Sequence, residues 1–134
     1  MKTKKKKSFL ADIPSWALAL FTLIGAFIVL FGLGEGVGNI LNIDENIADA
    51  IPYIIFDILI AVCCYFIVRQ NPRSIWYVPL ICNVTGIIAA IVEPTFWVTS
   101  LWMLIIGGWV LSLVASFLGW WAGRRATVRV SNTQ

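Results

Sequence analysis

The sequence contains no histidine and few charged residues of any kind. Without histidine, bis-histidine haem ligation, histidine-based zinc sites, Ser-His-Asp triads and imidazole proton shuttles are excluded. Charged residues make up only 13% of the 134 residues and hydrophobic types 60%, against about 25% and about 45–50% in an average soluble domain. Because so few polar side chains could not cover a water-exposed surface, this composition excludes an ordinary soluble domain, a disordered protein and a nucleic-acid-binding protein. It predicts an integral membrane protein.

Four long runs with at most one charged residue predict four membrane-spanning helices. A helix needs about 20 apolar residues to cross a bilayer. These runs are apolar on every face, unlike lipid-facing strands, in which apolar and polar residues alternate. The predicted spans are residues 14–34, 51–68, 74–92 and 96–122. The predicted fold class is therefore all-α, an integral membrane four-helix bundle that occupies residues 14–123.

Proline and acidic residues predict how these helices begin and bend. Asp49 is expected to cap the second helix, with Pro52 in its first turn. Pro79 lies within the third span and is expected to bend it. Residues 35–50 form the predicted outer loop, which is acidic and starts with glycines. Its acidic residues do not match the spacing of a calcium-binding loop, so a solvated acidic surface is expected.

The basic residues predict the orientation of the chain. With four crossings, both termini and the turn between the second and third spans share one side. That side carries all ten basic residues, which are Lys2, Lys4, Lys5, Lys6, Lys7, Arg69, Arg73, Arg124, Arg125 and Arg129. The opposite side carries Glu35, Asp44, Glu45, Asp49 and Glu93. Because lysine and arginine gather on the cytoplasmic side, the prediction is N-in/C-in in a plasma (inner) membrane.

Two cytoplasmic tails follow from this topology, a basic one at residues 1–13 and a second at residues 124–134. The lysine-rich N-terminal tail is expected to lie against anionic lipid at the membrane surface. A lysine-rich start before an apolar run also occurs in signal peptides. This run is too long for a typical signal sequence and no A-x-A-like site follows it, so we expect it to be retained as the first span.

Small residues on the fourth span predict a helix-packing face. Residues four apart lie on one side of a helix, and small side chains there let two helix backbones approach closely in lipid. The favoured interpretation is packing within the chain against the first or third span, and the alternative is self-association. The face consists of Gly108, Ser112 and Ser116 in one row and Ala115, Gly119 and Gly123 in a second row beside it.

Asp57 is the most informative single position. It lies about six residues into the second span, or about 9 Å below the outer edge. A carboxylate at that depth is costly unless it is paired, hydrated or protonated, and no span holds a basic partner. One interpretation is a proton or cation site, with Tyr53 one turn outward on the same face and Ser100 at comparable depth in the fourth span. The other is a neutral aspartic acid that hydrogen-bonds a neighbouring helix.

The remaining polar or reactive residues favour structural roles. Asn83 and Thr85 form the polar spot of the third span and are expected to hydrogen-bond between helices, although a ligand contact in a polar cavity is the alternative. Cys63, Cys64 and Cys82 lie at similar depth in the inner half of the membrane and are expected to act as small apolar filler. They follow no secreted disulfide pattern and offer too few ligands for a soft-metal site, so no metal or cofactor is predicted.

Two hypotheses for function follow. The first is a small non-catalytic membrane protein, an accessory, assembly or self-associating subunit whose partners are the lipid bilayer and other copies or a larger membrane complex. The alternative is a small oligomeric transporter or channel that uses Asp57 for protons or cations. An enzyme is disfavoured because the sequence has no Gly-rich phosphate loop, metal cluster or nucleophile–base pair.

Overall fold

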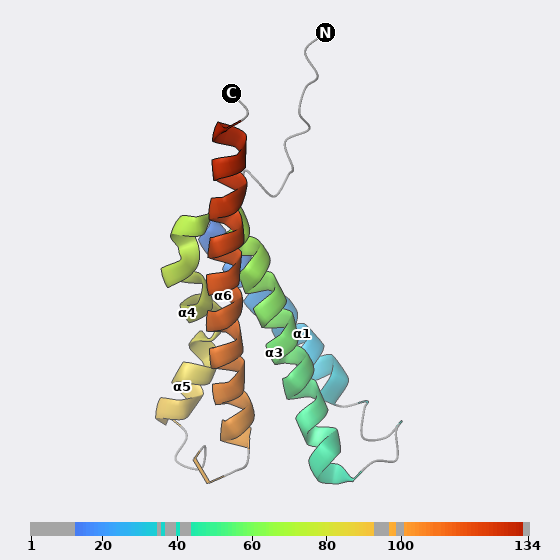
Figure 1. Ribbon diagram of the computed structural model, residues 1–134. Helices are drawn as coiled ribbons and strands as arrows, with labels where there is room; N and C mark the ends of the chain where they lie inside the picture. Colours follow the sequence, from blue (N-terminus) through green and yellow to red (C-terminus); the bar gives the residue numbers. More distant parts are fainter. Residues whose placement is uncertain are drawn as a thin grey trace.

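The computed structural model of the chain is built from helices (Figure 1). It describes residues 13–34, 36, 40, 44–92, 97–98 and 101–132, and these ranges contain no strand. The long helices are α1 (Ser15–Gly34), α3 (Glu45–Gln70) and α6 (Leu101–Ser131). Shorter helical pieces lie between α3 and α6, namely η2 (Pro72–Trp76), α4 (Val78–Cys82) and α5 (Val84–Val92). The predicted all-α class is confirmed.

The three long helices are also long and apolar enough to cross a membrane. The qualifying stretches are Ser15–Leu33, Ala50–Gln70 and Trp102–Ser131. At 1.5 Å per residue each stretch covers about 28 Å or more, against a hydrocarbon core of about 30 Å. Most of their large apolar side chains point outward rather than into the molecule. This length and composition are those of a membrane protein.

The second helix begins earlier than the sequence suggested. α3 starts at Glu45, after an N-cap Asp44 whose side chain makes no capping hydrogen bond. Asp49 lies inside the helix, so its predicted role as the cap is wrong, and residues 45–50 belong to α3 rather than to the outer loop. Glutamate and alanine in this stretch favour helix. Pro52 is accommodated inside α3, where it removes one backbone donor.

The segment predicted as the third span is not one helix. η2 and α4 each carry a proline in the first turn, where the missing N–H has no partner to lose. Asn83 ends α4, and its Nδ2 donates back to the carbonyl of Pro79 at 2.7 Å, which also accepts the backbone N–H of Asn83 at 3.1 Å. Such a local side-chain bond competes with continuation of the helix. α5 then has nine residues, about 14 Å of helix, and is too short to span a bilayer alone.

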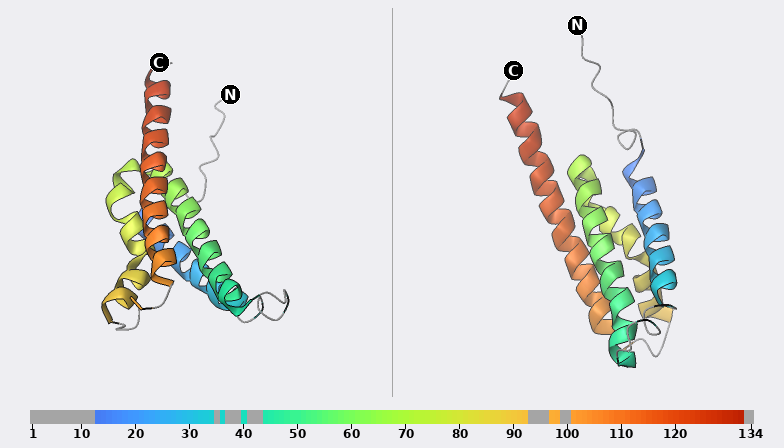
Figure 2. Two further views of the ribbon diagram at one scale, coloured as in Figure 1. Left: turned by 60° about the horizontal axis from the view of Figure 1, so that its bottom comes forward. Right: turned by 90° about the vertical axis from the view of Figure 1, so that its right-hand side faces the viewer.

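α3 is the central helix of the molecule. It packs against α1 on one side and, most extensively, against α6 on another, while α4 also contacts α1 (Figures 1 and 2). The core is small and comes from α1, α3 and α4, with Ala19, Ala26, Ile60, Cys64, Ile67, Val68, Val78 and Cys82 as its buried members. A few small and branched side chains therefore hold the helices together.

One end of the molecule gathers the start of α1, the end of α3, η2 and the C-terminal turns of α6 (Figure 1). There Asn71 Nδ2 donates to Ser15 Oγ at 3.0 Å, which links the start of α1 to the turn after α3. Ser74 Oγ in turn donates to the Asn71 carbonyl at 2.6 Å. α6 continues to Ser131, so most of the predicted second tail is helical.

Candidate functional site

A row of small residues on α6 forms the closest helix contact in the molecule, and we call it the small-residue seam. A side-chain carbon on Gly119 would lie 2.5 Å from the Tyr65 carbonyl oxygen, and one on Gly123 would lie 2.6 Å from the Arg69 carbonyl oxygen. Only glycine leaves room for such backbone contact. The seam consists of Gly108, Ser112, Ser116, Gly119 and Gly123, all buried, with Ala115 half-buried beside it.

The main partner of the seam is not one of the two expected, although Ser112 of the seam also hydrogen-bonds Asn83 of the predicted third span. The sequence favoured packing against the first or third span, whereas the glycine contacts are with α3, the second long helix. The sequence pattern identifies a close-packing surface but carries no information about which neighbour fills it. Because α3 occupies the seam, a second copy has no access to it, and self-association must use another face.

Asp57 points from α3 at the outer end of this seam. Its carboxyl group occupies the space that a side chain on Gly108 would need, with Oδ2 at 2.8 Å from the position of that carbon. Asp57 is half-buried, and within the described ranges its carboxyl takes part in no hydrogen bond or ion pair. Gly108 therefore acts as a recess that receives the carboxyl group between two apolar helices.

Asn83 and Ser112 make a polar contact one helical turn further along α6. Asn83 Nδ2 donates to Ser112 Oγ at 2.7 Å, and Ser112 Oγ donates to the Trp109 carbonyl at 2.9 Å. This is an interhelical hydrogen bond of the kind expected for Asn83. Since residues 108 and 112 are four apart, the carboxyl of Asp57 and this hydrogen bond lie about 6 Å apart along the axis of α6.

The other polar candidates have fewer defined contacts than Asp57 and Asn83. Tyr53 is half-buried on α3 one turn before Asp57, and Thr85 is half-buried in α5. Ser100 lies outside the described residues. A role that the sequence did not reveal belongs to Trp109, whose indole Nε1 would lie 3.0 Å from a side-chain carbon on Gly86. Gly86 thus allows α5 to approach α6 beside the hydrogen bond from Asn83.

Two thiols meet in the core below the polar contacts. Cys64 of α3 and Cys82 of α4 are fully buried and contact each other, and Cys64 also lies beside Ser116. The Ser116 hydroxyl is buried and makes no hydrogen bond among the described residues. Within those residues no group of three or more side chains could hold a metal ion. This cluster packs three helices together as small, adaptable filler.

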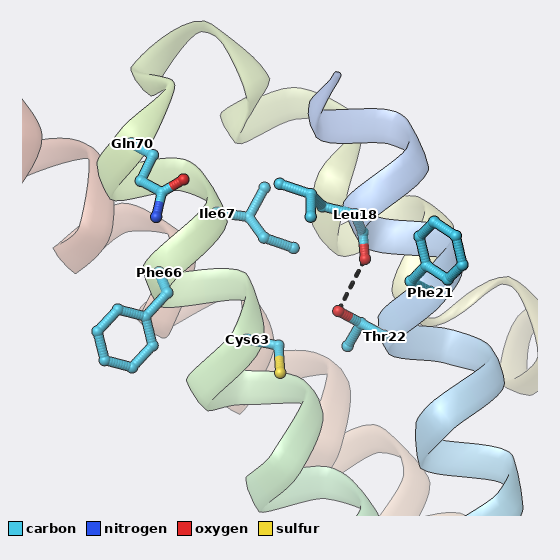
Figure 3. A pocket seen from close by; sticks show the side chains of 7 residues that line it. All are labelled: Leu18, Phe21, Thr22, Cys63, Phe66, Ile67 and Gln70. Atoms are coloured by element: carbon cyan, nitrogen blue, oxygen red, sulfur yellow. Dashed lines mark hydrogen bonds between the residues drawn. The ribbon is translucent and has the colours of Figure 1, made fainter. Parts of the chain in front are cut away.

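A groove of about 340 Å³ runs between α1 and α3 (Figure 3). Its walls are almost entirely apolar, and the Thr22 hydroxyl donates to the Leu18 carbonyl of its own helix at 2.9 Å. Gln70 supplies the polar group at one end. The groove is lined by Leu18, Phe21, Thr22, Cys63, Phe66, Ile67 and Gln70. It lacks the convergent polar groups that orient a specific ligand.

No protein-family model, curated protein or solved structure matches the chain. A functional argument therefore starts from two features of the described residues. One is the isolated carboxyl of Asp57 between α3 and α6. The other is the set of apolar faces that the chain's own packing leaves uncovered.

Proposed function

We propose that the chain is a four-crossing membrane protein with both termini in the cytoplasm, which acts as a non-catalytic, self-associating subunit. Support for four crossings comes from η2, α4 and α5, which together run beside α6 from its start to the level where α3 ends (Figure 1). Support for the orientation comes from the charge distribution, because Arg69, Arg73 and Arg124 occupy the end where α1 starts and α6 finishes, and basic residues favour the cytoplasmic side.

The observation that carries the self-association proposal is an outward-facing pair of glycines on α1. A side-chain carbon on Gly25 or Gly32 would have no atom within 4 Å. The two glycines are seven residues apart and so lie on one face of the helix. Large apolar residues flank them on that face, with exposed fractions from 56% to 70%: Phe21, Ile24, Ile28 and Phe31.

Like the small-residue seam, this face of α1 has small residues that would allow close contact with another helix, but no helix of the chain covers it. In lipid, helices associate where small residues let backbones approach and neighbouring side chains interlock. The face carries no charge, so it fits an apolar transmembrane helix. In a symmetric dimer the same patch serves both subunits, and the phenylalanine and isoleucine side chains of one α1 would fill the space above Gly25 and Gly32 of the other. The proposed partner is therefore a second copy of this chain.

Co-purification of two differently tagged copies from native membranes tests the self-association proposal. The wild-type copies are expected to co-purify, and Gly25→Leu or Gly32→Leu is expected to reduce their recovery together. Gly107→Leu is the matched control, because Gly107 also faces open space but lies on α6. Failure of wild-type copies to associate, or equal losses in all three variants, would contradict the proposal.

Reporter fusions at the two termini test the topology separately. Both fusions are expected to report from the cytoplasm. Signals from opposite compartments would rule out an even number of crossings, and two external signals would reverse the orientation. Neither result depends on whether the chain self-associates.

A second candidate function is supported by the isolated carboxyl of Asp57. A carboxyl group that lies between apolar helices without an ion pair is typical of proton and cation pathways in membranes. In this proposal the carboxyl exchanges a proton or a cation from its recess beside Gly108. Flux through purified protein in liposomes tests this candidate, with Asp57→Asn expected to abolish flux and Thr22→Val as the control, because the Thr22 hydroxyl bonds only its own helix. Equal flux in wild type and Asp57→Asn would eliminate it.

A further inference from the structure

Three arginines from different elements meet at the end of the molecule where η2 lies. The last residue of the seam, Gly123, lies at this end. A side-chain carbon on Gly123 would lie 3.1 Å from Pro72 Cγ and would overlap the carbonyl oxygen of Arg69. Arg73 follows Pro72 and Arg124 follows Gly123 in the chain. This contact places the backbones of Arg69, Arg73 and Arg124 near one another, and all three side chains are exposed. We call them the arginine cluster.

Trp120 fixes the position of the Arg124 side chain along α6. The indole of Trp120 is half-buried and packs against the hydrophobic core. The guanidinium carbon of Arg124 lies 4.9 Å from the centre of that ring, a cation–π distance. Because the ring is fixed by the core, the guanidinium is drawn back along α6 toward the apolar part of the molecule. It thus lies where the lipid headgroups of a surrounding membrane would be.

No acidic group neutralises the cluster within the described part of the chain. The guanidinium groups of its three arginines take part in no hydrogen bond or ion pair there. The described acidic side chains, Asp44 and Asp57, belong to the other end and to the interior of the bundle. Several unpaired guanidinium groups in one place bind phosphate well, because the planar fork of N–H donors matches two phosphate oxygens at once.

We propose that the arginine cluster binds the phosphate of an anionic phospholipid headgroup. The surroundings favour a lipid over a free phosphate. Trp76, three residues after Arg73, is exposed, and tryptophan is enriched at the level of the headgroups. The apolar faces of α3 and α6 continue from this level along the molecule, so acyl chains of the bound lipid can follow them. The proposal requires that the helices span a membrane but not that this end faces the cytoplasm or that the chain self-associates.

Electron paramagnetic resonance of spin-labelled lipids tests the proposal. Wild-type protein in phosphatidylcholine liposomes is expected to prefer labelled phosphatidylglycerol several-fold over labelled phosphatidylcholine. The triple variant Arg69→Gln, Arg73→Gln and Arg124→Gln is expected to lose most of this preference. The charge-matched control Lys4→Gln, Lys5→Gln and Lys6→Gln removes three charges from the basic tail and is expected to lower the preference much less than the triple arginine variant.

Two further controls separate a site from general attraction. Arg125 lies over Trp121 with its guanidinium carbon at 3.5 Å from the ring centre, but two residues beyond Gly123 it is on the opposite side of α6. Arg125→Gln is therefore expected to keep the preference, whereas the single variant Arg124→Gln lowers it. The single variant also keeps the test valid if the triple variant does not fold.

Several results would overturn the proposal. One is an equal loss in the cluster and tail variants, which would mean that only total charge matters. Another is a loss in the tail variant alone, which would place the preference in the basic tail. A third is loss of the wild-type preference on adding inorganic phosphate, when chloride at the same ionic strength has no effect. That result would assign the site to free phosphate rather than to a lipid.

Discussion

Adding one methyl group to the small-residue seam is the most direct perturbation of the fold. In Gly119→Ala the new carbon would lie 2.5 Å from the Tyr65 carbonyl oxygen, about 0.9 Å short of an ordinary contact at 3.4 Å. The obstructing atom belongs to the backbone of α3 and cannot rotate away. α3 and α6 must therefore separate, which loosens the packing along the seam. Overpacking of this kind costs about 1–3 kcal/mol, and a rigid backbone contact places the cost at the upper end.

Gly107→Ala is the control that isolates this packing cost. Gly107 lies in the same helix, and a side-chain carbon there meets nothing within 4 Å. Both variants gain the same helix propensity, about 1 kcal/mol from glycine to alanine. The difference between them therefore reports packing alone. We expect Gly119→Ala to be less stable than Gly107→Ala by about 2–3 kcal/mol, or roughly 6–10 °C in melting temperature.

The buried thiols provide the assay. Cys64 and Cys82 are fully buried, so a dye that fluoresces on reaction with thiols reports unfolding in detergent without any label being added to the protein. Melting curves of wild type, Gly107→Ala and Gly119→Ala give the comparison directly. If Gly119→Ala melts with or above Gly107→Ala, the backbone contact between α3 and α6 is not as described, and the argument from the seam fails.

Three other predictions concern the interior. The variants Asn83→Ala and Ser112→Ala are expected to lose stability in a non-additive way, with a coupling energy of about 1 kcal/mol, as found for hydrogen bonds between membrane helices; additive losses in a double-mutant cycle would contradict the 2.7 Å hydrogen bond. Ser116→Ala is expected to be neutral or stabilising because the hydroxyl it removes has no partner among the described residues, and a loss above about 1 kcal/mol would show that one exists. Cys64 and Cys82 are expected to resist a membrane-permeant maleimide until the protein is denatured, and mass spectrometry would detect early labelling.

The helices could be predicted where the physical signal is direct. Long apolar runs with at most one charged residue correctly located α1, most of α3, and α6. The start of α3 was missed because residues 45–50 are polar, so hydropathy does not distinguish a helical extension from a loop. The third segment shows the opposite failure. Its hydropathy resembles that of the other runs, but backbone hydrogen bonding at Pro79 and Asn83 divides it into short pieces.

The candidate site was only partly predictable. The spacing of small residues on α6 indicates a contact surface, and Asp57 stands out as a charge in an apolar run. That the carboxyl of Asp57 fits against Gly108 depends on the register between two helices, which a single sequence does not contain. A useful signal was nevertheless present, because Asp57 is an acid in an apolar run and Gly108 is the first of the small residues spaced along α6. The outward-facing glycines of α1 carried no such signal, since their surroundings appear only in the folded chain.

The seam also determines how this protein can vary over evolutionary time. On the exposed side of α6, Leu111 and Val114 can be exchanged for other hydrophobic residues at little cost to the packing between helices. On the side that meets α3, a carbon added at Gly119 or Gly123 displaces a neighbouring backbone. Distant relatives would consequently differ at most positions of this helix while keeping the spacing of its small residues. They would be recognised by that interval, together with one carboxylic acid in the preceding long helix, long after overall identity has faded.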